Sequence, residues 1–149
     1  MSADRSARHL VRRFAGSLSR GAPSPSDDTW AMGFLLPAEG VLWRQLAHPD
    51  QRHTVAVARR FIELRPMAPR AEVAGALLHD IGKLESGLGT MCRVVATVVG
   101  PRTTRFRAYH AHESIGAQML LDAGSDPATI DLVLGRGPAA DALSAADDH

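Results

Sequence analysis

The sequence predicts an all-α protein, and three observations point to this fold class. Apolar residues recur at the three- and four-residue spacing of helix faces along nearly the whole chain. No segment of six or more residues alternates β-branched and polar side chains as a half-buried strand does. The 149 residues include 24 alanines, the residue with the highest helix propensity. A chain of this length has the size of one globular domain.

Proline, glycine and polar clusters divide the chain into predicted helices and connections. The predicted helices span about Ala3 to Ser19, Pro37 to Leu46, Pro49 to Arg65, Pro69 to Leu84, Leu88 to Val99, Ala108 to Ala123, Pro127 to Leu134 and Pro138 to the end. The stretch from Gly21 to Asp28 is predicted to be a flexible linker, and Pro101 to Arg107 a basic loop. We therefore expect an N-terminal helix and linker over residues 1–39 and the main domain over residues 40–149.

The charges of the chain nearly cancel but are unevenly placed. Seventeen basic and sixteen acidic residues give a formal net charge of +1, and there are few aromatic residues to stack on bases, so we expect no nucleic-acid partner. Residues 51–107 have ten Arg or Lys against four Asp or Glu, whereas residues 108–149 have one against seven. The basic middle favours an anionic substrate and the acidic end favours cations. Solvated faces that offset each other are the alternative interpretation.

The cellular setting predicted from the sequence is the cytoplasm. The single cysteine, Cys92, cannot form an internal disulfide, which fits a reducing compartment. The first twenty residues lack the uninterrupted apolar core of a secretory signal. No window approaches the run of about 20 apolar residues that spans a bilayer, so no membrane partner is expected.

One histidine lies on an apolar helix face in the segment that begins near Pro49. Val57, Phe61 and Leu64 form the apolar stripe of this predicted helix. One turn before Val57 lies His53. We therefore expect the His53 side chain to point inward.

A histidine and an aspartate continue the apolar face of the next predicted helix. Val73, Ala76 and Leu77 form its stripe. Three or four residues later this stripe reaches Asp80, with His79 directly beside it. Such a pair is costly to bury unless it is hydrogen-bonded, ion-paired or bound to a metal.

A third helix adds another histidine to these. Ile115, Gly116, Met119 and Leu120 form its apolar face, which extends back to His112. Gly116 allows another backbone or a ligand to approach closely. Imidazole nitrogens together with a carboxylate suit divalent transition metals, whereas calcium prefers oxygen ligands. The sequence therefore predicts a metal site where the three helices meet.

The order of these residues resembles the HD superfamily of metal-dependent phosphohydrolases. That family is defined by a histidine, then an HD pair, then a distant aspartate. This chain has His53, then His79 and Asp80 within LLHDIGK, and an aspartate within ALSAADD; HESIGAQML resembles the helix that follows the pair. The resemblance covers roughly residues 40–148. It implies a compact HD-domain bundle of about six to eight helices that hydrolyses a phosphate ester, such as a nucleotide or another small phosphorylated metabolite.

The resemblance also implies the cofactor and its ligands. The cofactor would be a divalent metal ion (Mn, Fe, Co, Ni, Zn or Mg). The implied ligands are His53, His79, Asp80 and Asp147. Asp147 fits the family pattern best because it follows a small apolar helix segment, and Asp148 and Asp141 are the alternatives. His112 corresponds to a family position that binds a second metal or the substrate phosphate.

The implied mechanism is hydrolysis by water activated at the metal. Asp80 would coordinate the metal and orient the nucleophile. Lys83, the only lysine of the chain, lies on nearly the same helical side as Asp80 and would neutralise phosphate charge; a plain cation at a helix C-terminus is the alternative. Arg102, Arg105 and Arg107 are candidates for clamping the substrate phosphate.

A second hypothesis is a catalytically degenerate HD module that binds a nucleotide or metal in signalling. Many catalytic members of the family have further histidines before the final aspartate, whereas the interval VLGRGPAADAL has none. A second metal is therefore not expected. The chain also stops two residues after Asp147, so we expect a pocket that is either more open or completed by the partner subunit of a homo-oligomer.

Overall fold

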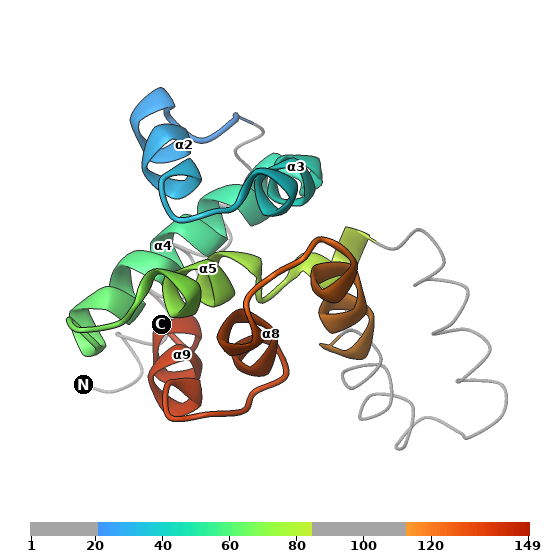
Figure 1. Ribbon diagram of the computed structural model, residues 1–149. Coiled ribbons are helices and arrows are strands. Elements are labelled where there is room, and N and C mark those ends of the chain that lie inside the picture. Colours follow the sequence, from blue (N-terminus) through green and yellow to red (C-terminus); the bar gives the residue numbers. More distant parts are fainter. Residues whose placement is uncertain (1–20, 85–112) are drawn as a thin grey trace, which may run out of the picture.

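The computed structural model in Figure 1 describes residues 21–84 and 113–149. Its helices are α2 (Pro25–Met32), α3 (Pro37–Gln45), α4 (His48–Leu64), α5 (Arg70–Leu78), the 3-10 helix η1 (Ile81–Leu84), α8 (Pro127–Val133) and α9 (Ala140–Asp147). Residues 113–122 are helical as well, and no strand occurs in the two described ranges, so the all-α prediction is confirmed. None of the helices in these ranges is long and apolar enough to cross a bilayer. The predictions for residues 3–19, 88–99 and 101–107 lie outside the described residues.

Proline begins several of these helices, as the sequence predicts. A proline occupies one of the first two positions of α2, α3, α4 and α8. Its missing N–H costs nothing there, and its fixed φ suits the first helical turn. The starts predicted at Pro37, Pro49 and Pro127 are therefore confirmed to within one residue.

The flexible linker predicted over Gly21 to Asp28 is wrong, because α2 begins inside it at Pro25. The Ser24 side chain accepts a hydrogen bond from a first-turn backbone N–H and so caps the helix. The helix is also held by tertiary contact, since the Arg59 guanidinium lies 4.2 Å from the centre of the Trp30 ring. The proposed division of the chain at residue 40 stays a prediction.

The hydrophobic core forms where α4, α5, α8 and α9 meet. Helix α5 packs against α4 and α8, and α9 packs against α4 (Figure 1). Phe61 of α4, Leu77 of α5 and Leu132 of α8 are buried in one cluster. The stripes predicted for α4 and α5 are confirmed with one exception: Leu64 is 54% exposed, because α4 ends at this residue.

The continuous helix predicted from Pro69 to Leu84 is wrong beyond Leu78. Helix α5 ends there, His79 and Asp80 form a turn, and η1 follows. The His79 ring donates a hydrogen bond to the Ala76 carbonyl at 2.7 Å, which satisfies one of the acceptors that an α-helix leaves without a partner at its C-terminus. The turn therefore places a histidine and an aspartate at the end of α5.

Gly116 brings the helix over residues 113–122 directly onto η1. A Cβ atom at this position would lie 3.2 Å from the Gly82 backbone nitrogen and 3.2 Å from a methyl group of Ile81. The close backbone approach expected for Gly116 is confirmed. This contact forms one wall of the region around the HD pair.

Candidate metal centre

The His79 ring has one nitrogen with a partner and one without. Nδ1 lies 2.7 Å from the Ala76 carbonyl oxygen, which only accepts, so Nδ1 carries the hydrogen. In the neutral ring, Nε2 then carries a lone pair. This Nε2 atom is buried and has no hydrogen-bond partner among the described residues. Because buried polar atoms are almost always hydrogen-bonded, the exception calls for an explanation.

Three side chains from different parts of the fold converge at this nitrogen. Asp147, at the end of α9, places its Oδ1 atom 2.9 Å from His53 Nε2 on α4 and 3.5 Å from His79 Nε2. One possible ligand atom from each of the three residues lies within 4.8 Å of the other two. The structure thus brings together three of the four ligands that the sequence analysis implied.

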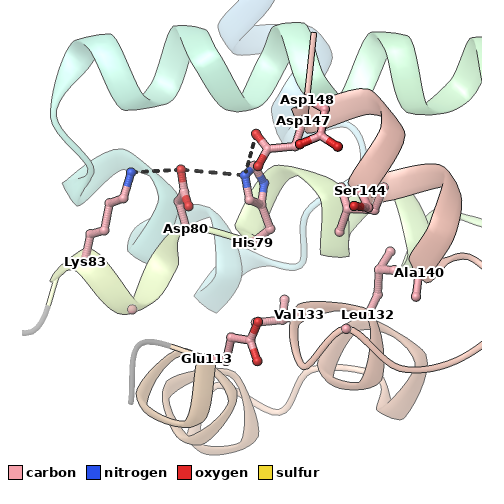
Figure 2. A pocket seen from close by; sticks show the side chains of 13 residues that line it. His79, Asp80, Lys83, Glu113, Leu132, Val133, Ala140, Ser144, Asp147 and Asp148 are labelled. Carbon is pink, nitrogen blue, oxygen red and sulfur yellow. Dashed lines mark hydrogen bonds and ion pairs between the residues drawn. The ribbon is translucent and has the colours of Figure 1, made fainter. Parts of the chain in front are cut away.

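The fourth, Asp80, lies beside this group. Its Oδ2 atom is 3.6 Å from His79 Nε2 and 3.0 Å from Lys83 Nζ, and Lys83 Nζ is also 3.6 Å from Asp50 Oδ1. Figure 2 shows Lys83, Asp80, His79 and Asp147 joined in this order by ion pairs. Asp80 therefore links the ammonium of Lys83 to His53, His79 and Asp147, which we call the metal group. The role of Asp80 as a ligand stays a prediction.

Asp147 is held in place although it lies close to the end of the chain. The preceding residue, Ala146, is fully buried, and its carbonyl accepts a hydrogen bond from Arg60 Nε at 2.8 Å. The two alternatives for the late ligand do not belong to the group: Asp148 is exposed at the pocket, and Asp141 is exposed in the first turn of α9.

The pKa values of the site reflect this crowding. The hydrogen bond from His53 and the nearby His79 ring hold the pKa of Asp147 far below its ordinary value, although burial opposes the shift. Burial lowers the pKa of His79, but the nearby carboxylates of Asp147 and Asp80 outweigh it, so the pKa is raised. Burial likewise opposes the charge of Lys83, yet Asp80 and Asp50 raise its pKa. The site therefore favours a positive charge between its carboxylates.

The donor atoms fit a divalent metal. A lone pair on His79 Nε2 that faces an Asp147 carboxylate oxygen at 3.5 Å is unfavourable, since both atoms are acceptors. Either a proton on the ring or a cation bound by both atoms removes this conflict. Two imidazoles and a carboxylate are a donor set typical of Zn and other transition metals, and three protein ligands leave a position open, as in catalytic sites.

Some predicted site residues lie outside the described ranges, and two residues near the site were not predicted from the sequence. The predicted substrate contacts that lie outside the described residues are His112, Arg102, Arg105 and Arg107. Asp50 and Arg60 were not predicted as site residues. They lie three residues before and seven residues after His53, which places all three on one face of α4. That spacing is the signal by which the sequence could have revealed them.

A pocket of about 370 Å³ opens beside the metal group. His79, Asp80, Lys83 and Asp147 line one end of it, and Glu113 lies across from them (Figure 2). The volume is within the range of about 300–1,000 Å³ that is usual for small-molecule sites. The pocket therefore has room for a small molecule next to the three candidate ligands.

No family model, curated protein or solved structure matches this chain.

Arg60→Leu is expected to weaken metal binding about tenfold, because losing a group that positions a ligand typically costs about 10- to 100-fold in metal affinity. The change removes the hydrogen bond that holds the Ala146 carbonyl beside the candidate ligand Asp147. Isothermal titration of the metal-free protein with Zn²⁺ or Mn²⁺ measures the effect.

Arg59→Leu is the matched control, since Arg59 contacts Trp30 and Asp27 of α2 instead of α9. It should lower thermal stability and leave the metal affinity unchanged. Equal affinities of the wild type and Arg60→Leu would contradict the role of Arg60.

Proposed function

We propose that this protein is a metal-dependent phosphohydrolase that acts on a small phosphorylated metabolite in the cytoplasm. The observation that carries the proposal is the buried, unpartnered Nε2 atom of His79, which faces the carboxylates of Asp147 and Asp80 at 3.5 and 3.6 Å. The neighbouring pocket and the ammonium of Lys83 at its edge support the choice of an anionic substrate. The HD-like order of the residues agrees with this chemistry.

The metal ligands we propose are His53, His79 and Asp147, with Asp80 as a fourth. When bound, a divalent metal would supply Lewis acidity and lower the pKa of a water molecule at the site. Asp80 would accept a hydrogen bond from that water and so orient it toward phosphorus. Lys83, held by Asp80 and Asp50, would offset the charge of the phosphoryl oxygens.

The proposed reaction is an in-line displacement at phosphorus. The oxygen of water forms a bond to phosphorus, and the bond from phosphorus to the ester oxygen breaks. The departing oxygen takes up a proton and leaves as an alcohol, and inorganic phosphate is the other product. Asp80 is the group placed to accept the proton that the attacking water loses.

The test combines elemental analysis of protein purified without chelator with a screen of phosphate esters, including nucleotides. We expect about one equivalent of a divalent metal and measurable hydrolysis by the wild type. Asp80→Ala should lose at least about 100-fold in rate, the scale on which general acid–base groups contribute. Asp131→Ala, an exposed aspartate of α8 outside the pocket, should change nothing.

Two results would change the interpretation. A metal-bound wild type that hydrolyses no ester would favour the degenerate signalling module. The absence of histidines between residues 113 and 148 also favours that module. Activity that survives Asp80→Ala would contradict the proposed mechanism.

Metal affinity is expected to fall as the pH falls. A metal needs the unprotonated His79 ring, so binding displaces its proton. Because the pKa of His79 is raised above its ordinary value of 6.5, this competition begins above pH 6.5. It deepens at lower pH, by about tenfold in affinity per pH unit and proton displaced. The pKa of Asp147 is lowered, so this carboxylate does not compete in that range. Titrations between pH 5 and pH 8 measure the slope, and a flat profile would contradict binding through His79.

A further inference from the structure

The pocket beside the metal group has two chemically different ends. At one end lie the ionisable side chains of His79, Asp80, Lys83 and Asp147. An aliphatic wall of Leu132, Val133, Ala140 and Leu143, from α8 and α9, lines the pocket away from this end, and Glu113 and Ser144 lie beside it. Figure 2 shows Leu132, Val133 and Ala140 across the cavity from the row of ion pairs. A ligand that places a phosphate at the metal therefore directs its organic part toward aliphatic side chains.

The apolar wall is the outer edge of the hydrophobic core. Leu132, Val133 and Leu143 are 2%, 5% and 8% exposed, and all three belong to the core cluster. Side chains packed in this way have few alternative rotamers, so the wall keeps its shape when the pocket is empty. A preformed apolar surface binds an aliphatic group without the cost of ordering side chains.

The charges of the pocket disfavour a second anionic group on the substrate. Four acidic residues line it, against the single ammonium of Lys83 among the described residues: Asp80, Glu113, Asp147 and Asp148. A divalent metal and Lys83 can balance one phosphate at the polar end. A further carboxylate or phosphate would meet Asp148 or the aliphatic wall, where an unpaired charge is costly.

We propose that the site takes phosphomonoesters of short, uncharged aliphatic alcohols, with the alkyl chain on the wall formed by Leu132, Val133, Ala140 and Leu143. This inference rests on the proposed phosphohydrolase function and names its substrate class. Gly135 lines the same pocket, and none of residues 21–84 and 113–149 has an atom within 4 Å of the position that a Cβ atom would take there, apart from the immediate chain neighbours of Gly135. The wall therefore ends in open space, and a longer chain gains nothing once it passes this point.

The test uses n-alkylphosphonates from methyl to octyl, which cannot be hydrolysed, titrated into the metal-loaded protein. Affinity is expected to rise about two- to fourfold for each added methylene and then to level off, since burying one methylene contributes at most about fourfold. A phosphonate with a terminal carboxylate should bind more weakly than the alkyl compound of equal length. The n-alkyl phosphates, assayed beside nucleoside monophosphates, should show the same dependence in kcat/KM.

Variants of the aliphatic wall test whether the dependence of affinity on alkyl chain length arises at this wall or from binding of the phosphonate group alone. Val133→Thr keeps the shape of the side chain but adds a hydroxyl group, so the dependence on chain length should flatten while metal affinity is retained. Ala140→Ser, at a partly exposed position, is the second variant in case Val133→Thr does not fold. Leu64→Ser, on an exposed side chain outside the pocket, should leave the series unchanged.

A series without any dependence on chain length, or a preference for nucleotides or carboxylated phosphonates, would overturn the inference. Failure of the proposed function is a separate result: no ester would be hydrolysed, whereas the phosphonate series would still report how the pocket binds.

Discussion

Asp147→Asn is expected to abolish the stabilisation that a divalent metal gives the wild type. A ligand at 100 times its dissociation constant stabilises the folded state by about 2.7 kcal/mol, which for a domain of this size raises Tm by about 5–10 °C. Asparagine has the same shape and can still accept a hydrogen bond from His53, but it lacks the charge that binds the cation. The loss in affinity should exceed the roughly 100-fold that marks the loss of a group supporting a ligand.

The measurement is thermal unfolding with and without Zn²⁺ or Mn²⁺, followed by direct titration. Asp148→Asn is the matched control, because it removes the neighbouring acidic group, which is exposed and outside the group of three. It should keep the metal-dependent rise in Tm. A rise that persists in Asp147→Asn, or disappears in Asp148→Asn, would place the late ligand elsewhere.

The largest loss of stability is expected for Phe61→Ala. The Phe61 side chain is fully buried in the core cluster between α4 and its neighbours. Replacing a buried phenylalanine by alanine costs about 3–5 kcal/mol, through lost transfer free energy and the cavity left behind. Since a typical domain has a free energy of unfolding of only about 5–15 kcal/mol, this change removes a large share of it. Urea or thermal unfolding measures the difference.

Leu64→Ala is the matched control for this core position. The two residues lie on the same predicted stripe of α4, but Leu64 is 54% exposed. Substitutions at exposed positions usually change stability by less than about 0.5 kcal/mol. Similar losses for the two variants would show that Leu64 is covered in solution.

The helical framework could be read from the sequence because its signals are local. The prolines of α3, α4 and α8 mark helix starts, and the spacing of Val57 and Phe61 marks a buried face. The linker prediction for Gly21 to Asp28 is wrong because a serine followed by a proline can begin a helix as well as a loop. In the structure, Arg59 of α4 packs on Trp30 of α2. The sequence does not reveal such a contact between two helices.

The ionisable residues of the site show the same division. The positions of His53 and of the HD pair relative to the apolar helix faces indicated them as site residues. The resemblance to the HD superfamily indicated Asp147. The break of α5 at Leu78 was not foreseen, since it accompanies a side-chain hydrogen bond from His79 to Ala76. The supporting residues Asp50 and Arg60 went unnoticed because an ion pair or hydrogen bond across the fold depends on which helices become neighbours.

The sequence by itself determined that this chain is helical and that His53 continues the apolar face of α4, because helix period and turn chemistry act over a few residues. Only the tertiary structure decided that His53, His79 and Asp147 share one centre and that one nitrogen there lacks a partner. That outcome depends on how α4, α5 and α9 pack, and the packing of segments almost a hundred residues apart is set by the whole core, not by any local stretch.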